Sequence, residues 1–208
     1  MNNISKRIVS TITAVVAAAA MSVTAFAANY GSEPSYPSTS PVAPSAPSNE
    51  VEESIENAIN NSEADKEEGT ATVEVENTDA LVLSAKTVKK LKGTEDGKIE
   101  IVSPKVTISI DAESIEKAAK INLSSTVKNT SNSSTIKFNS RGSFGCEVKI
   151  TLTDCKLSKA ALKKAHVYRT VKNPSSGKTV TVDLGPVELD ENGNPVIIAT
   201  AGGEYTIT

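Results

Sequence analysis

Residues 98–111 read Lys-Ile-Glu-Ile-Val-Ser-Pro-Lys-Val-Thr-Ile-Ser-Ile-Asp, and this stretch decides the fold class. Branched apolar residues at every second position are typical of a strand that buries one of its faces. The alternation runs on both sides of Ser103-Pro104, and two strands with so short a connection are expected to form a hairpin. The sequence therefore predicts antiparallel β-structure here.

The same alternation recurs outward from this hairpin, after residue 70. Further strands are predicted at 71–75, 121–127, 135–139, 147–153, 167–171, 180–184, 196–200 and 205–208. We expect 135–139 and 147–153 to form a second hairpin. We also expect the Val, Ile and Leu residues of 180–184 to be buried against a sheet, like those of 106–110 and 148–152. The prediction is a mainly β (α+β) fold, a sandwich-like module of antiparallel hairpins over 70–208.

Short helices are expected between the strands. Good N-cap residues precede them, and the pairs of cap and helix are Ser84 with 85–92, Asp111 with 113–119, and Ser158 with 159–165. The helices after Ser84 and Ser158 are rich in lysine, and each leads into a strand, a turn and a second strand. Two similar halves of the module, 84–110 and 158–184, therefore remain an open alternative.

The first 27 residues have the three parts of a secretory signal peptide. A start with two basic residues is followed by an apolar stretch over 8–23 and by Ala25-Phe26-Ala27, which suits a signal peptidase. Cleavage is predicted between Ala27 and Ala28. The alternative is an uncleaved anchor, because a bilayer span takes about 20 residues. We expect a secreted, extracellular protein with no membrane span after cleavage, and association with the cell surface stays open.

Two further segments separate this leader from the module. Residues 28–49 are rich in Pro and Ser, which predicts an extended tether without a core. Residues 50–69 are acidic, and their apolar residues predict a short amphipathic helix followed by a loop: Val51, Ile55, Ala58 and Ile59.

Charge is divided along the chain after the leader. Residues 28–79 hold 12 acidic residues and one lysine, whereas residues 80–208 hold 19 basic and 13 acidic residues. A basic module suggests a nucleic acid or an anionic glycan as partner. However, its lysines are dispersed and its only arginines are Arg141 and Arg169. We expect no nucleic-acid partner, and a solvated surface that the acidic helix partly balances.

The composition leaves little for catalysis or cofactors. The chain has no Trp and a single His, His166, which is predicted at the start of a strand without a nucleophile motif. Asp190–Pro195 begins like a calcium loop, but Pro195 stands where such a loop needs Gly. A hairpin turn is the favoured interpretation. No catalytic residue, metal ligand or cofactor is predicted, and the chain is not expected to be an enzyme.

Cys146 and Cys155 are the two cysteines. They lie nine residues apart at either end of a predicted strand, and nine extended residues span about 30 Å. A disulfide needs Cα atoms within about 7 Å. We expect two reduced, buried cysteines, and the alternative disulfide requires that the strand be folded back or misassigned.

Four segments carry a resemblance to a known kind of module. They are Leu83–Gly93 (Leu-Ser-Ala-Lys-Thr-Val-Lys-Lys-Leu-Lys-Gly), the hairpin 98–111, Asp190–Asn194, and Gly202–Thr208 (Gly-Gly-Glu-Tyr-Thr-Ile-Thr). Together they resemble a β-rich extracellular module of secreted surface proteins of Gram-positive anaerobic bacteria, found beside S-layer-homology or dockerin modules. The resemblance covers about 70–208. It implies a bacterial, non-catalytic structural or adhesive module.

Two functions follow as expectations. The first is a secreted, non-catalytic surface or extracellular-matrix module that acts through structural or protein–protein contacts. The alternative is a carbohydrate-binding module for cell-wall or dietary polysaccharide. The partner is an unknown extracellular protein or polysaccharide. Only 3% of the residues are aromatic, which weakens the alternative because sugar sites often use aromatic stacking.

Overall fold

The structure is a computed structural model, and it describes residues 12–15, 49–64, 70–94, 97–173 and 176–208. The helices are α1 (Asn49–Ala64), α2 (Ala85–Gly93) and α3 (Lys159–Leu162), with one 3-10 turn, η1 (Ala112–Ser114). The strands of the larger sheet are β1 (Ile12–Val15), β2 (Thr70–Glu74), β4 (Lys98–Val102), β5 (Thr107–Asp111), β9 (Ser143–Thr151), β12 (Glu188–Leu189) and β13 (Pro195–Ala201). The second sheet is formed by β7 (Ser125–Asn129), β8 (Ser134–Phe138), β10 (His166–Lys172), β11 (Thr179–Pro186) and β14 (Glu204–Ile207). Strands β3 (Val82–Leu83) and β6 (Ile121–Asn122) form a small separate pair.

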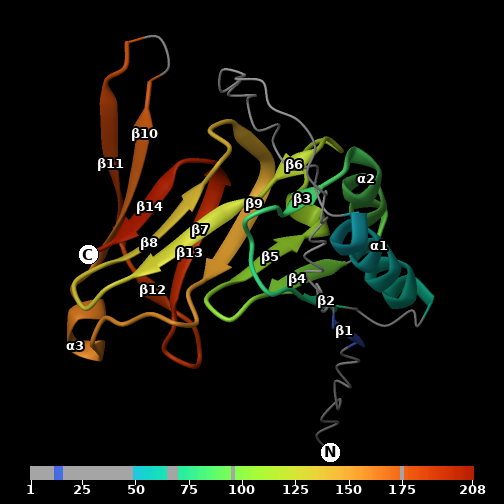
Figure 1. The fold of residues 1–208 in the computed structure, drawn as a ribbon, viewed down its shortest axis with the longest axis horizontal. Helices are drawn as coiled ribbons and strands as arrows, with labels where there is room; N and C mark the ends of the chain where they lie inside the picture. Colours follow the sequence, from blue (N-terminus) through green and yellow to red (C-terminus); the bar gives the residue numbers. More distant parts are fainter. Residues whose placement is uncertain (1–11, 16–48, 65–69, 95–96, 174–175) are drawn as a thin grey trace, which may run out of the picture.

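The two large sheets and the helices enclose one hydrophobic core. The seven-stranded sheet has the order β1-β2-β4-β5-β9-β13-β12, and the five-stranded sheet has the order β11-β10-β14-β8-β7. Most neighbouring strands are antiparallel; β2 is parallel to both β1 and β4. The five-stranded sheet lies at one end of the molecule and the helices α1 and α2 at the other (Figure 1). The prediction of a mainly β, sandwich-like fold is confirmed.

The predicted hairpin of residues 98–111 is the centre of the larger sheet. Strands β4 and β5 pair antiparallel, with Ile99 opposite Ile110 and Ile101 opposite Ile108. All four isoleucines are fully buried. Strand β9 continues the sheet, with Ile150 opposite Ile108. The alternation of the sequence thus becomes one buried face of three strands.

The second predicted hairpin, 135–139 with 147–153, is wrong. Strand β8 pairs with β7 and β14 in one sheet, whereas β9 pairs with β5 and β13 in the other. The chain passes from the five-stranded sheet to the seven-stranded sheet between β8 and β9, and it returns between β13 and β14. The two crossings are joined by a hydrogen bond, in which Gly202 N–H donates to Gly142 O over 2.9 Å. The hairpin partner of β8 is β7, and Thr130 N–H donates to Ser133 O to close the tight turn between them.

The helix predictions hold in part. Helix α2 begins after Ser84, whose hydroxyl accepts a hydrogen bond from Thr87 N–H, and α3 begins after Ser158 but is shorter than expected. The helix predicted over 113–119 is wrong: only the 3-10 turn η1 forms. In the rest of the predicted helix, Glu116 N–H donates to Gly145 O of β9 rather than to a carbonyl of its own segment.

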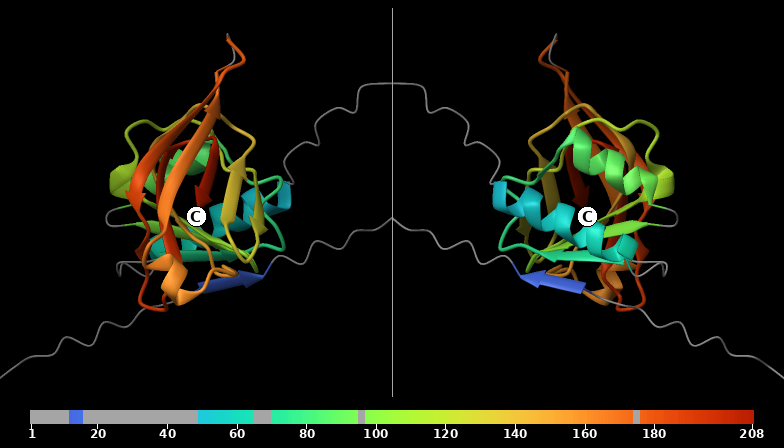
Figure 2. Two further views of the ribbon diagram at one scale, coloured as in Figure 1. Left: turned by 90° about the vertical axis from the view of Figure 1, so that its left-hand side faces the viewer. Right: turned by 90° about the vertical axis from the view of Figure 1, so that its right-hand side faces the viewer.

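The acidic helix α1 shares the core of the module. Its residues Ile55, Ala58 and Ile59 are buried in that core. It lies beside the lysine-rich α2 (Figure 2), where the Glu56 carboxylate is 2.9 Å from Lys86 Nζ and 3.6 Å from Lys90 Nζ. The hydrogen bond from Lys86, with the charges of both lysines, lowers the pKa of Glu56. The acidic segment therefore neutralises part of the basic module.

Part of the predicted leader lies within the larger sheet. Strand β1 is its end strand and pairs parallel with β2, with Ile12 opposite Ala71 and Val15 opposite Glu74. The predicted cleavage residues Ala25, Ala27 and Ala28, and nearly all of the predicted tether, lie outside the described residues. The secretory leader stays a prediction.

Aromatic residues fill the core beneath the five-stranded sheet. The ring of Phe138 contacts Phe144 edge-on at 5.2 Å and Tyr205 edge-on at 6.1 Å between centroids. The buried Tyr205 donates its hydroxyl proton to Ala201 O over 2.6 Å. Three of the four aromatic residues after position 70 are thus used for packing.

Candidate functional site

Among the described residues, an unusual apolar surface lies on β11. Val180 and Val182 point to the same side of this strand and Leu184 follows where the register with β10 shifts; the exposed fractions of the three are 54%, 50% and 49%. We call these three residues the β11 face. The prediction that they are buried is wrong, whereas Val106, Ile108 and Ile110 of the equivalent predicted segment are buried.

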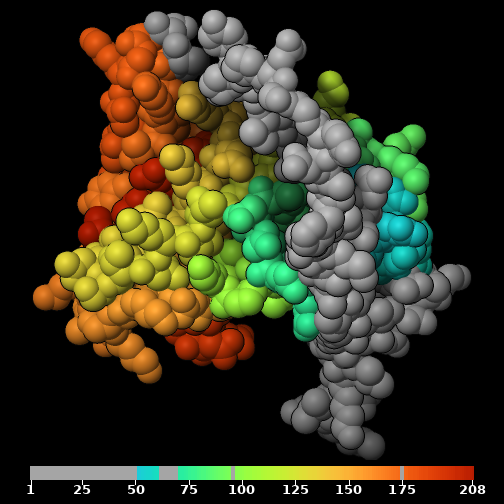
Figure 3. Space-filling view, in the orientation of Figure 1, coloured from blue at the N-terminus to red at the C-terminus, as the bar shows by residue number. Residues whose placement is uncertain are grey.

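The position of the hairpin explains this exposure. Strand β11 is the end strand of its sheet and pairs only with β10 in it, where Val180 lies opposite Val171 and Val182 opposite Arg169. The β10–β11 hairpin projects beyond the rest of the sandwich (Figure 1), and its residues form the margin of the molecule in the space-filling view (Figure 3). Of the two strands of this hairpin only Val167 on β10 is buried in the core, and no residue of β11 is buried.

The free edge of β11 also presents backbone groups. On β10, His166 exchanges backbone hydrogen bonds with Thr208 beyond β14, whereas Asn173 N–H donates to Lys178 O on the β11 side. Because these directions alternate along a strand, Arg169 and Val171 bond to β11 through their partners Val182 and Val180. The backbone N–H and C=O groups of Thr179, Thr181 and Asp183 therefore point away from β10.

The opposite face of the hairpin carries the only histidine. His166 Nδ1 lies 3.1 and 2.9 Å from the two carboxylate oxygens of Asp183, and its ring stacks on Tyr168 at 6.2 Å. The N–H of Gly185 and the imidazole lower the pKa of Asp183. His166 is the first residue of β10, as predicted, and its side chain is 42% exposed.

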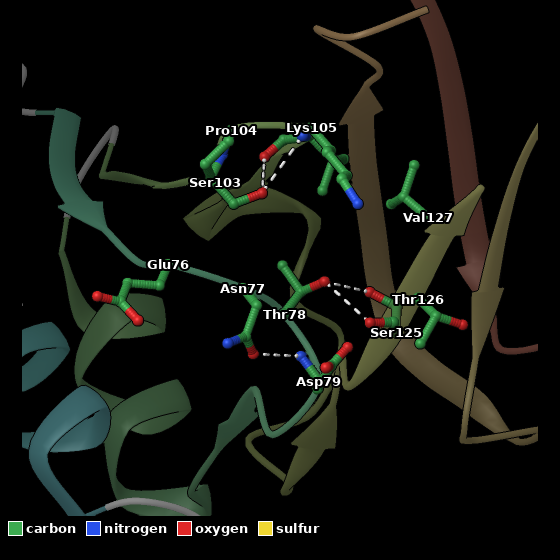
Figure 4. Close-up of a pocket in the computed structure, with 11 residues that line it drawn as sticks. Glu76, Asn77, Thr78, Asp79, Ser103, Pro104, Lys105, Ser125, Thr126 and Val127 are labelled. Atoms are coloured by element: carbon green, nitrogen blue, oxygen red, sulfur yellow. Dashed lines mark hydrogen bonds between the residues drawn. The ribbon is translucent and has the colours of Figure 1, made fainter. Parts of the chain in front are cut away.

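A polar pocket of about 310 Å³ opens where the β4–β5 turn approaches β7 (Figure 4). Its innermost polar groups bond to one another: Thr78 Oγ1 donates to Ser125 O, and Ser125 Oγ donates to Thr78 Oγ1. Ser103 Oγ likewise donates to Val106 O. These hydroxyls stabilise loop crossings and are not available to a ligand. At the rim Glu76 points away from the other labelled side chains (Figure 4).

A second, open pocket of about 460 Å³ has an acidic rim. The carboxylates lining it are Asp111, Glu113, Glu116 and Glu147. Nevertheless, within the described ranges no group of three or more His, Cys, Asp or Glu side chains is arranged to hold a metal ion. An acidic rim without convergent ligands does not define a cation site.

The segment that begins like a calcium loop is a hairpin turn, which confirms the favoured interpretation. Residues 190–194 connect β12 to β13, with Leu189 opposite Pro195. Asp190 Oδ1 accepts hydrogen bonds from the N–H groups of Asn192 (2.9 Å) and Asn194 (2.7 Å). Burial acts to raise the pKa of Asp190, but these N–H donors outweigh it and lower the pKa. The carboxylate thus stabilises its own turn.

The cysteines are separated by most of β9. Cys146 is buried inside this strand, which begins four residues earlier than predicted, and Cys155 lies beyond its end. Both are free thiols, but Cys155 is only partly buried, contrary to the prediction, and its Sγ lies 3.1 Å from Ser134 Oγ. Burial, with the charge of Glu116, raises the pKa of Cys146 to about 11. A thiol with so high a pKa is a poor nucleophile at neutral pH.

Comparison of the chain with models of protein families, with curated proteins and with solved structures finds no match. Its resemblance to modules of secreted surface proteins therefore stays a prediction. Among the described residues, no helix has both the length and the apolar character needed to cross a bilayer.

Proposed function

We propose that the chain is an exported, non-catalytic module of the cell surface or extracellular matrix that acts by binding protein. The observation that carries this proposal is the β11 face. Exposed apolar side chains on an unpaired strand edge are what a partner strand recognises, because backbone hydrogen bonds supply affinity and alternate side chains supply specificity. Natural proteins usually protect such edges with lysine, proline or a covering segment.

The strand β11 has little of this protection. Its only charged residue is Asp183, whose carboxylate is bonded to His166 and to Gly185 N–H. Its only proline is Pro186, at the last position of the strand. An edge so neutral and apolar favours contact with protein over contact with water.

A catalytic function has less support than protein binding. His166 is the one imidazole that could act as a general base, and its Nδ1 is held by Asp183 on the exposed face of the hairpin. The polar groups deepest in the pocket of Figure 4 satisfy one another. The proposal predicts that His166→Ala changes no turnover of wall polysaccharides or ester substrates. A hydrolytic activity that His166→Ala abolishes would contradict it.

The carbohydrate-binding alternative rests on Tyr168. It is the one aromatic residue of the module outside the core cluster, and its ring is stacked on His166. A single aromatic ring gives a sugar one stacking contact. One stacking contact supports only weak binding of a sugar. Strand β11, in contrast, offers a protein partner three apolar side chains and free backbone groups.

The two candidate functions can be separated by one array experiment. The whole chain would be applied to extracellular proteins and to wall and dietary glycans, with Val182→Lys and Tyr168→Ala as variants. Protein binding that Val182→Lys removes and Tyr168→Ala leaves intact supports the proposal. Ile198→Lys is a matched control, because Ile198 is 47% exposed, as Val182 is 50%, but lies on β13. Glycan binding that Tyr168→Ala removes would contradict the proposal.

A further inference from the structure

We propose that the partner of β11 is a second copy of the same chain, and that two β11 strands pair antiparallel about a twofold axis at Thr181. This inference rests on the proposed role of the β11 face in binding protein. It would join two five-stranded sheets edge to edge across an isologous interface, the commonest symmetry of protein pairs.

The backbone selects the register. The groups that point away from β10 belong to Thr179, Thr181 and Asp183, and a hydrogen-bonded antiparallel pair must join such residues to one another. An axis at Thr181 places Thr181 opposite its own copy and Thr179 opposite Asp183 of the second copy. All three residues of each strand then bond across the axis.

Neighbouring registers are poorer. A shift by one residue would place the outward groups of one strand opposite inward-facing residues of the other. A shift by two toward the end of the strand would bring Gly185 into the ladder, but the Gly185 N–H already donates to Asp183 Oδ1 over 2.8 Å. The Thr181-centred register avoids both defects.

The same register brings the β11 face together. Val180 lies opposite Val182 of the second copy, and the axis repeats this contact, so four valines meet. These are non-hydrogen-bonded pairs, whose Cα atoms approach to about 4.5 Å and whose side chains lie close together. Cross-strand contacts between β-branched residues stabilise a sheet. Side chains that are half exposed in one copy thereby gain an apolar neighbour.

Charge agrees with this pairing. Asp183 is opposite the uncharged Thr179 of the second copy, and its carboxylate is already bonded to His166 and to Gly185 N–H of its own chain. Lys178, one residue before that threonine, points to the other face of the sheet, so no like charges face each other across the axis. A second copy of β11 carries both the valines and the uncharged threonine that this pairing requires.

A disulfide trap tests the axis directly. In the proposed pair the Cα atoms of the two copies of residue 181 are about 5.5 Å apart, within the range of a disulfide. The whole chain carrying Thr181→Cys should form covalent dimers under mild oxidation. Thr126→Cys is the matched control: Thr126 is exposed on β7, the other end strand of the same sheet. It should stay at least tenfold less cross-linked.

Sedimentation velocity over a concentration series provides a second measurement without new cysteines. The wild type should shift from monomer to dimer as concentration rises. Val182→Lys should raise the dissociation constant at least tenfold, and Ile198→Lys should leave it unchanged. Circular dichroism checks that each variant is folded, and the disulfide trap does not depend on the lysine variants.

The inference is overturned if the wild type is monomeric at every concentration and Thr181→Cys cross-links no faster than Thr126→Cys. It is also overturned if dimers form but Val182→Lys does not weaken them. The array experiment then tests the broader proposal that the β11 face binds protein. Binding of a foreign protein that depends on Val182 would keep the proposed function, and its absence would remove both.

Discussion

The guanidinium of Arg169 lies over the ring of Tyr205, 5.8 Å from its centroid. Its Nη2 also donates to Gly202 O over 2.7 Å. Arg169 therefore closes the aromatic core at the base of the β10–β11 hairpin and holds the turn where the chain changes sheet. Beyond this contact no described residue of the hairpin is fully buried; Thr170 and Val171 are partly buried.

Tyr205→Phe should lower the free energy of unfolding by about 0.5–1.5 kcal/mol, because it removes the hydrogen bond to Ala201 O and keeps the ring. Urea unfolding would measure the loss. Tyr168→Phe is the matched control: its ring lies on the outer face beside His166, and a change within about 0.5 kcal/mol is expected. Equal losses in both variants would contradict a structural role for the Tyr205 hydroxyl.

Gly202→Ala should destabilise the fold by about 3 kcal/mol or more, since a Cβ there would lie 2.0 Å from Ser140 O and force the sheet crossing apart. Gly93→Ala, where a Cβ meets nothing within 4 Å, serves as the control and should be neutral or slightly stabilising. Thermal unfolding of the two variants tests this prediction. A Gly202→Ala variant as stable as the wild type would mean that the crossing is not closely packed.

Acid should weaken the turn at Asp190. Its pKa is lower in the folded chain than its ordinary value of 3.8, so its contribution is present above that value and is lost as the pH falls through the lowered folded pKa. Unfolding free energies measured by urea at pH 7, 4 and 3 should therefore decline at the acidic end. The decline should be less steep in Asp190→Asn, and an unchanged slope would contradict the prediction.

The two thiols should differ in reactivity. In the native protein at pH 8, Cys155 should react first with a thiol reagent, because burial raises the pKa of Cys146 to about 11. After unfolding without reductant, two thiols per chain should react. A count of zero would indicate a disulfide and would require a different course for β9.

The hairpin of β4 and β5 could be predicted because its information is local. Alternation predicts the buried face, and the short connection around Ser103-Pro104, which is residues 103–106 in the structure, predicts the pairing. The helix starts at Ser84 and Ser158 are local in the same sense, since each hydroxyl bonds to the N–H three residues ahead. In these parts of the fold the predictions and the structure agree most closely.

What could not be predicted depends on distant residues. Strand β8 also pairs with β14, where Tyr205 lies opposite Ile136 although the two residues are far apart in the chain. The exposure of Val180 and Val182 had no local signal either. Alternation tells which face of a strand is apolar, but only the neighbouring layers decide whether that face is covered.

If β11 pairs with a second copy as proposed, the arrangement of the fold has a mechanical consequence. Helix α1, which follows the predicted tether in the sequence, and β11 lie at opposite ends of the molecule (Figure 1). Tension between them would pass from α1 through the larger sheet, across the core and along the five-stranded sheet. It would leave through the β10–β11 ladder, which runs from His166–Pro186 to Lys172–Thr179. The module would then carry load through its whole core, with that terminal ladder as the last link in the path.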